Sequence, residues 1–289
     1  MDRFHDGHHV WLRSRAHGLY LHADADDGSS VYLHRVRATV RAAWAVQILR
    51  NSDSGGGQML MLQSAANGRY LAATTSAWAA AAARFGLGGN RVTLRDFDQN
   101  PMHAAGWFPI RSGSGDDVLL GHASNRCLRA IDRRAWWGTN EITVVMSDGP
   151  CTPWVVEAIP PRDSIPRLPN PSSAVDIMRA IRFVRAERAF PDESFPPVGW
   201  GCFHFTGVSL FKLRIELAKR LGFTVVSDVI MCVRGGLFGR LTPLFTDLPF
   251  NNVTMEIIVV TAGTIAANEL RFPNVDAVWR KTELQEQNL

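Results

Sequence analysis

The chain has 289 residues, of which 46% are hydrophobic and 20% are charged, a length that favours two domains and a balance that excludes intrinsic disorder. No apolar run approaches the roughly 20 residues of a membrane-spanning helix. The net charge of +4 is evenly divided: residues 1–159 hold 16 Lys and Arg against 14 Asp and Glu, and residues 160–289 hold 15 against 13. We therefore expect neither a nucleic-acid partner nor a membrane.

The sequence has four scattered cysteines, namely Cys127, Cys151, Cys202 and Cys232. Most of them lie in apolar strand patterns. This placement predicts buried free thiols rather than disulfides, as is typical of a reducing compartment. The first residues have no apolar stretch of the secretory kind. We therefore expect a cytoplasmic protein, with the nucleus as an alternative.

Three histidines, His5, His8 and His9, lie close together near the start of the sequence. No cysteine and no second histidine cluster follows at the spacing of metal ligands. A flexible chain end is also a poor cage for a metal ion. We expect no metal and no cofactor.

Two segments, residues 10–23 (VWLRSRAHGLYLHA) and 60–73 (LMLQSAANGRYLAA), align without a gap. A third copy, residues 118–130 (VLLGHASNRCLRA), lacks one turn residue. Each copy alternates apolar and polar residues, passes through a Gly or Asn turn and continues into a second strand, which predicts a β-hairpin. Leu21, Leu71 and Leu128 occupy the same position in the three copies.

A tryptophan begins a closing strand after each copy, at Trp44, Trp107 and Trp154. Three hairpins with three closing strands are the elements of a β-trefoil, in which six strands form a barrel and three hairpins cap one end. The recurrent Leu and Trp side chains are expected to fill this small barrel. The repeats therefore predict a β-trefoil domain over residues 1–159.

Five prolines within residues 160–171 predict a semi-rigid linker over residues 160–174. The pattern that follows predicts strands at 180–186, 201–205, 228–233, about 240–246 and 254–261, and a helix at 210–221. Ser209 is its expected N-cap and Gly222 its end. This order resembles a β-grasp, or ubiquitin-like, domain over residues 175–263, and the polar residues 264–289 are expected to form a loosely attached tail.

Two further motifs bear on catalysis. Cys202 and His204 share one face of a predicted strand, so a thiol–imidazole pair is conceivable, but packing of Cys202 in the core explains the pattern better. The glycine-rich segment Arg234-Gly235-Gly236-Leu237 lacks the Gly-Lys-Ser/Thr of a phosphate loop and is predicted to be a turn. We expect no catalytic residues and a protein that is not an enzyme.

A tandem of tryptophans, Trp136 and Trp137, follows Arg133 and Arg134. On a strand, one ring of the tandem points inward and the other outward. An exposed Trp beside Arg is typical of a protein-binding hot spot. These four residues form the predicted binding surface, with packing in the core or in a loop as the alternative reading.

The sequence resembles the fascin-like β-trefoils, and among them a plant family classed as domain of unknown function 569. The resemblance lies in Val10–Ser14 leading to Tyr20–Asp24, in Trp44-Ala45-Val46, in Asn67–Leu71, in Leu128–Ala130 with Trp136–Asn140, and, in the second domain, in Phe203–Gly207 and Leu248–Met255. Together these segments cover most of residues 4–262.

This resemblance implies a protein-interaction module in which actin is the leading named partner. Fascin has four trefoils, whereas this chain has one, so bundling of filaments by a monomer is not expected. The alternative is a sugar-binding trefoil lectin. The Gln-x-Trp signature of ricin-type lectins is absent, because Ala42-Ala43, Ala105-Gly106 and Thr152-Pro153 precede the three tryptophans.

Overall fold

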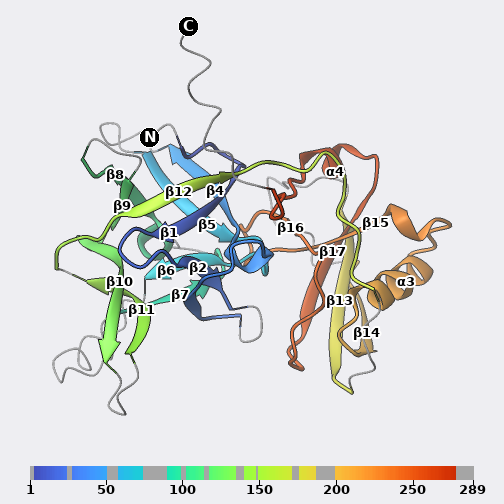
Figure 1. Ribbon diagram of the computed structural model, residues 1–289. Helices are drawn as coiled ribbons and strands as arrows, with labels where there is room; N and C mark the ends of the chain where they lie inside the picture. The colour runs from blue at the N-terminus through green and yellow to red at the C-terminus, as the bar shows by residue number, and fades with distance from the viewer. Residues whose placement is uncertain are drawn as a thin grey trace, which may run out of the picture.

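The computed structural model describes residues 3–24, 28–50, 58–73, 90–98, 102–113, 117–134, 140–147, 149–170, 176–186 and 199–277. Within these ranges a strand-rich N-terminal domain lies beside a smaller α+β domain (Figure 1). No helix in this part of the chain is long and apolar enough to cross a membrane. The prediction of a β-trefoil followed by a β-grasp-like domain is confirmed.

Six strands of the first domain form a closed barrel, because each pairs with two neighbours around a ring. In ring order they are β1 (His9–Ser14), β4 (Trp44–Arg50), β5 (Gln58–Ser64), β8 (Trp107–Arg111), β9 (Asp117–His122) and β12 (Trp154–Ile159). Three hairpins complete the trefoil: β2 (Tyr20–Ala23) with β3 (Val31–His34), β6 (Tyr70–Ala73) with β7 (Asn90–Arg95), and β10 (Arg126–Arg134) with β11 (Asn140–Ser147). Two short helices, η1 (Val40–Ala42) and α2 (Met102–Ala105), precede β4 and β8.

One hydrogen bond recurs in all three repeats and shows their pseudo-threefold relation. The indole nitrogen of the closing tryptophan donates to the carbonyl of the repeat leucine, at 3.0 Å for Trp44 to Leu21, 2.9 Å for Trp107 to Leu71 and 3.0 Å for Trp154 to Leu128. All six side chains are completely buried in one apolar cluster. Each bond satisfies an indole N–H inside the barrel, where an unpaired donor would be costly.

The turns from β1 to β2, from β5 to β6 and from β9 to β10 explain why the copies differ in length. Gly18 and Gly68 have φ of 68° and 74°, and in the shorter third turn Asn125 takes φ of 59°. Glycine adopts this left-handed conformation without strain, and Asn tolerates it better than most residues.

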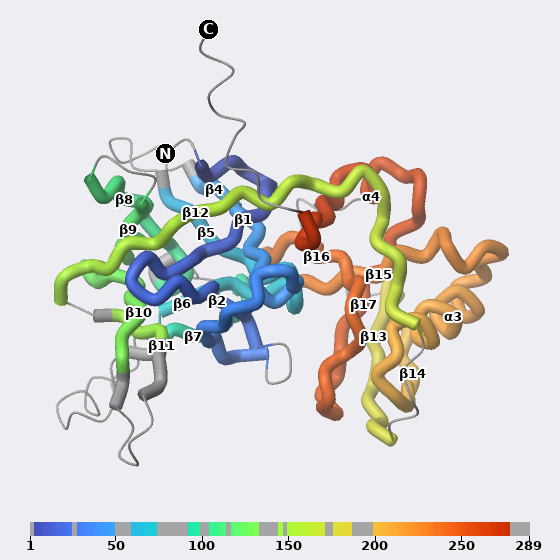
Figure 2. The backbone as a smooth tube through the Cα atoms, in the orientation of Figure 1, coloured from blue at the N-terminus to red at the C-terminus, as the bar shows by residue number. Residues whose placement is uncertain are grey.

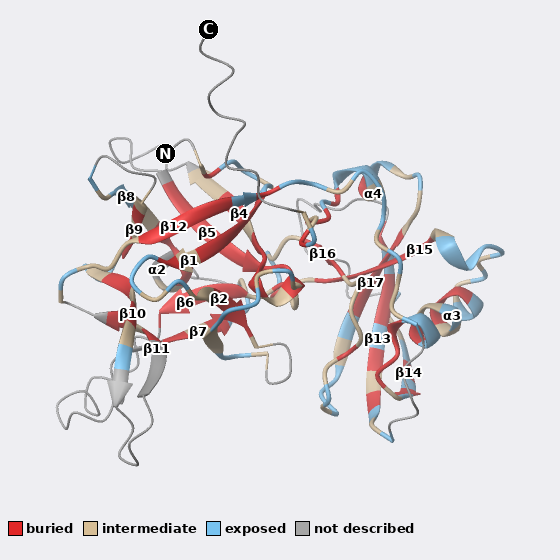
Figure 3. Cartoon of the chain, in the orientation of Figure 1, coloured by how far each residue is buried: buried red, intermediate tan, exposed pale blue. Residues whose placement is uncertain are grey.

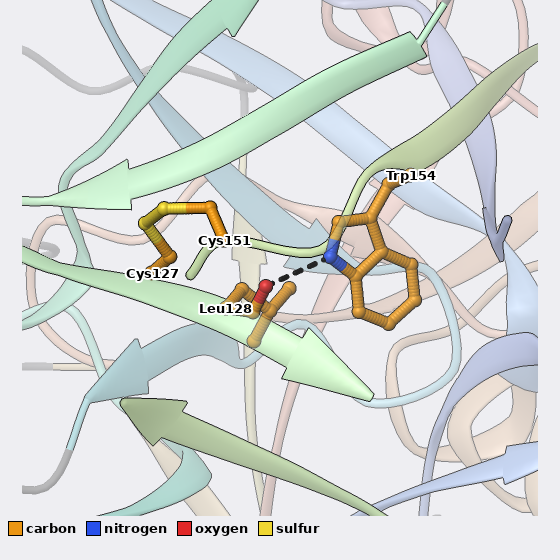
Figure 4. The surroundings of a disulfide bond; sticks show 4 residues. All are labelled: Cys127, Leu128, Cys151 and Trp154. Carbon is orange, nitrogen blue, oxygen red and sulfur yellow. Dashed lines mark hydrogen bonds between the residues drawn. A yellow bond between two sulfur atoms is a disulfide. The ribbon is translucent and has the colours of Figure 1, made fainter. Parts of the chain in front are cut away.

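A disulfide joins Cys127, at the start of β10, to Cys151, just before β12, with 5.5 Å between their Cα atoms (Figure 4). The prediction of four free thiols was therefore wrong for these two residues. Cys127 takes the place that Tyr20 and Tyr70 hold in the other repeats. Those tyrosines belong to apolar clusters that include residues just before Trp44 and Trp107, and Cys151 lies three residues before Trp154, within reach of Cys127.

The second domain is a five-stranded sheet in the order β14-β13-β17-β15-β16. Its strands are β13 (Met178–Ala186), β14 (Gly201–Thr206), β15 (Val229–Val233), β16 (Thr242–Pro243) and β17 (Met255–Thr261), with η2 (Val226–Asp228) before β15. The central pair, β13 and β17, is parallel, and the other pairs are antiparallel.

Helix α3 (Leu210–Arg220) covers one face of this sheet with Leu210, Leu213 and Leu217. Its N-cap is Ser209, whose side chain accepts from the Lys212 amide. Asp247 accepts from the Leu210 amide at 3.0 Å. The backbone N–H groups of Leu210 and Lys212, both in the first turn, thus have side-chain partners. The helix ends one residue earlier than the sequence predicts.

The opposite face of the sheet is covered by residues 264–277, for which the sequence had predicted a loose tail. This segment contains α4 (Ile265–Glu269) and buries Ala266, Leu270 and Phe272 against the sheet. It also holds the linker, because the Asn274 amide donates to the Pro160 carbonyl and the Arg162 amide to the Phe272 carbonyl, both at 2.9 Å. Residues 278–289 lie outside the described part of the chain.

The need for this cover is visible in the central strands. All five residues of β15 are buried, as are Ile257 to Val260 of β17 (Figure 3). Strands that are apolar on both faces need a layer on each side. The C-terminal segment supplies the second layer.

The two domains touch through the loop between β15 and β16, which the sequence predicted as a simple turn. Gly235 and Gly236 lie against the second trefoil repeat, where a Cβ on Gly235 would be 2.5 Å from the Gly68 carbonyl oxygen. The Phe238 amide donates to the Phe97 carbonyl at 3.0 Å. The linker after β12 crosses from the trefoil toward β13 (Figure 2).

Candidate functional site

The predicted surface of Arg133, Arg134, Trp136 and Trp137 lies at the end of the third hairpin. The backbone of Arg133 pairs with Glu141 and that of Arg134 with Asn140. The side chains of these two arginines, and both tryptophans entirely, lie outside the described residues. This surface stays a prediction.

The second pair singled out in the sequence, Cys202 and His204, is solvent-exposed on β14. The prediction that Cys202 packs in the core was wrong. The strand alternates as expected, but Phe203 and Phe205 point inward and the thiol and imidazole point outward. Among the described residues no cluster of three or more His, Cys, Asp or Glu side chains could hold a metal ion.

The other free cysteine, Cys232, is completely buried in β15, and burial raises the pKa of its thiol well above the usual range. A neutral, inaccessible thiol is a poor nucleophile. Cys232 therefore packs as a small apolar side chain.

Strand β14 lies at one edge of the sheet in the second domain. Within the described ranges, β14 pairs only with β13. The Gly207 amide donates to Ile177, so the alternation of antiparallel pairs directs the backbone of Phe205 and Phe203 toward β13. The N–H and C=O groups of Cys202, His204 and Thr206 consequently face away from the sheet, where another strand could pair with them.

A groove of about 410 Å³ runs beside this edge, between β14 and α3. Its β14 side is formed by residues 203–206, and its α3 side by Lys212, Ile215, Glu216 and Arg220. The Arg220 guanidinium lies 4.1 Å from the centre of the Phe203 ring and forms a cation–π contact. The groove thus has an apolar floor of aromatic rings beside a charged rim.

The rim has more basic than acidic groups. On the helix side of the groove lie Lys212 and Arg220 and a single acidic residue, Glu216, which pairs with Arg220 at 3.5 Å. Phe211 and Ile215, 39% and 42% exposed, add an apolar strip on the solvent side of the helix. A partner with apolar side chains and acidic neighbours would complement both features.

The sequence held part of the signal for this groove. Phe211 and Ile215 are four residues apart but lie off the Leu210, Leu213 and Leu217 face, which indicates a second apolar surface on the helix. Nothing local shows that β14 is an edge strand, because strand order is decided by pairing between distant segments.

A second groove, of about 560 Å³, lies where Asn67 and Arg69 of the trefoil approach residues 249–256. Its charged groups are already engaged within the protein. Arg69 pairs with Asp96 at 2.9 Å, and Asp98 accepts from the Leu237 amide at 3.1 Å. This groove is better explained as part of the domain contact than as a binding site.

Comparison with known protein families agrees with this two-domain architecture. Residues 1–156 match the profile of the β-trefoil domain of unknown function DUF569. The chain belongs to the DUF569 family. Residues 177–260 match the ubiquitin-like domain that is associated with DUF569. No curated protein matches the chain.

Three solved structures are similar to about half of this DUF569 chain. The SDF2-like protein from Arabidopsis thaliana is 18% identical with a TM-score of 0.42, and the alignment covers 53% of this chain and 94% of that one. A ricin B-like lectin from Macrolepiota procera, solved with lactose, is 13% identical with a TM-score of 0.38, covering 53% and 96%. A Caenorhabditis elegans protein of unknown function is 15% identical with a TM-score of 0.40, covering 54% and 96%.

Proposed function

We propose that this DUF569 protein is a non-catalytic protein-binding module, and that its partner lies as an extended segment along β14 beside α3. The observation that supports this is the open edge of β14 next to an apolar groove with a basic rim. An added strand would pair with the outward backbone groups of Cys202, His204 and Thr206. Alternate side chains of that strand would enter the groove, and acidic residues would meet Lys212 and Arg220.

The partner implied by the fascin-like resemblance is filamentous actin. A single groove provides one site, so the monomeric protein should bind filaments without bundling them. Rim contacts between exposed charges weaken with salt, since the screening length is about 8 Å at physiological ionic strength. Co-sedimentation at high and low speed, at two salt concentrations, tests this. An affinity for filaments that does not change with salt concentration would contradict a single basic site. Bundling of filaments by a verified monomer would contradict it too.

The mode of binding is tested with labelled peptides and fluorescence anisotropy. One peptide carries a short run of Val and Ile followed by an acidic run, and a second has Lys in place of the acidic residues. The acidic peptide should bind, and Lys212→Glu should weaken it about tenfold by replacing attraction with repulsion. Lys219→Glu, on the same helix but outside the groove lining, should change little.

Strand addition has its own test in His204→Pro. Proline removes one outward N–H and leaves the bonds of Phe203 and Phe205 to β13 in place, a change that edge strands tolerate. Peptide affinity should fall sharply while the melting temperature changes little. Equal affinity for both peptides, or full affinity in His204→Pro, would refute this mode of binding.

The proposal that the protein is not an enzyme is tested at Cys202. The exposed Cys202 should react slowly with alkylating reagents at neutral pH. Rapid labelling, as an activated thiolate would give, would point to catalysis instead.

The lectin alternative finds less support in the described trefoil. The repeat tryptophans Trp44, Trp107 and Trp154 are fully buried, so their rings have no free face for a sugar.

A further inference from the structure

A separate cavity of about 270 Å³ lies between the two domains, away from the β14 groove. One wall comes from β1, β4 and β5 of the barrel, and the other comes from residues 240–243 and 269–271 of the second domain. The cavity exists only because the domains pack together.

The barrel wall has a hollow with polar sides. His9, Ala45 and Gln63 form one row across three adjacent strands, since His9 is paired with Ala45 and Ala45 with Gln63. The small side chain in the middle leaves space between two larger polar ones. Gln47 follows Ala45 on the same outward face of β4. His9, Gln47 and Gln63 are all buried, with exposed fractions of 8%, 9% and 3%.

These buried groups retain hydrogen-bonding capacity. Gln63 uses its amide N–H groups for the Gly68 and Arg240 carbonyls, at 2.9 Å and 2.8 Å, and its side-chain oxygen has no partner among the described residues. The Gln47 oxygen accepts from the Tyr70 hydroxyl at 3.1 Å, and its NH₂ group has no described partner. The same is true of the ring nitrogens of His9. The described part of the cavity wall thus has free hydrogen-bond donors next to free acceptors. A hydroxyl group of a ligand can use both, because it donates one hydrogen bond and accepts others.

The cavity has no net charge to attract an ion. Burial, and secondarily the neighbouring His8, lowers the pKa of His9 to about 4, so its ring is neutral at physiological pH. Two acidic and two basic residues surround the opening: Asp6 pairs with Arg240 at 3.1 Å, and Glu269 and Arg271 are both exposed. An ionic ligand would lose its hydration here without gaining a counter-charge.

We propose that this interdomain cavity binds a small, uncharged, hydroxyl-rich ligand of monosaccharide size. Its volume lies just below the roughly 300–1,000 Å³ of pockets for drug-sized ligands, which restricts the ligand to about one ring. Hydroxyl groups would bond to His9, Gln47 and Gln63, and the ring would lie over Ala45 against the apolar side chain of Leu241. The site is independent of the β14 groove, so each can fail without the other.

Isothermal titration calorimetry on the full chain tests this with defined compounds: glucose, galactose, mannose and myo-inositol, with glucuronate and glucosamine as charged counterparts. At least one uncharged compound should bind saturably at one site and raise the melting temperature. Glucuronate and glucosamine should each bind at least about tenfold more weakly than that compound.

Two variants locate the binding. Ala45→Leu should fill the hollow and abolish binding, and His9→Phe keeps a ring of similar shape without nitrogens and should weaken binding about tenfold or more. Ala123→Leu, at an exposed turn position, is the matched control and should bind normally. If Ala45→Leu does not fold, His9→Phe alone decides.

Three results would overturn the proposal. The first is that no uncharged compound binds, which would mean that the cavity holds only water. The second is that binding survives in both Ala45→Leu and His9→Phe, which would put the site elsewhere. The third is that glucuronate or glucosamine binds as tightly as the uncharged compounds.

Discussion

Two buried histidines should make the stability of the trefoil depend on pH. Burial lowers the pKa of both His9 and His22 to about 4, and the backbone carbonyl of Val36, 2.8 Å from the His22 ring, only partly opposes this. In the unfolded chain both would titrate near 6.5. The folded state therefore requires two neutral imidazoles.

Stability should consequently fall as pH decreases from about 6.5 to 4. In that window the unfolded chain binds protons that the folded chain does not, whereas above 6.5 both states are neutral and the stability is fully present. Each histidine lowers the free energy of unfolding by up to about 1.4 kcal/mol per pH unit. Melting temperatures measured from pH 7 to pH 4 test this, and His9→Phe should show a shallower decline. An unchanged slope in that variant would mean that His9 titrates normally when folded.

At the scale of elements, the third hairpin differs from the other two because it is covalently tied to the barrel. The disulfide connects β10 to the residues before β12 across a sequence separation of 24. Cys127 and Cys151 therefore do not indicate a reducing compartment, since structural disulfides are typical of oxidising compartments.

Removal of this disulfide in the double variant Cys127→Ser/Cys151→Ser should cost about 3 kcal/mol, because a loop of this length gains that much freedom in the unfolded chain. Urea denaturation measures the loss. Cys202→Ser, at an exposed position, is the control and should cost little. Alkylation of the unreduced, denatured protein should label Cys202 and Cys232, and labelling of all four cysteines would contradict the disulfide.

For the whole molecule, one part of the contact between the domains leaves no room for a side chain at Gly235 or Gly236 of the β15–β16 loop. A Cβ on Gly236 would lie 2.6 Å from the Phe97 amide nitrogen, and one on Gly235 would lie 3.0 Å from the Arg69 Cα atom. These neighbours are backbone atoms and cannot rotate away. Further along the loop, the Arg240 amide donates to the Tyr70 hydroxyl at 3.1 Å.

Gly235→Val should therefore separate the loop from the trefoil while leaving each core intact. Calorimetry should show one unfolding transition for the native protein and two for the variant, because the domains of the variant no longer unfold together. Leu237→Ala is the control in the same loop, since its side chain is 39% exposed and its contacts are made by the backbone. A single unchanged transition in Gly235→Val would mean that the contact contributes little.

The sequence by itself determined the elements and the repeat. The hairpins, the closing tryptophans, the Ser209 cap and the alternation of β14 are local patterns, because turn chemistry and side-chain periodicity act over a few residues. The leucine and tryptophan positions of the trefoil followed from comparing one copy with another.

Only the tertiary structure decided what those elements meet. The Cys127–Cys151 bond, the cover of residues 264–277, the outward face of Cys202 and the cavity beside Ala45 all arise from contacts between distant segments. Two of these left a trace in the sequence, namely the cysteine in the tyrosine position and the strands that are apolar on both faces. The other two left none, because the order of strands in a sheet and the docking of two domains depend on non-local pairing.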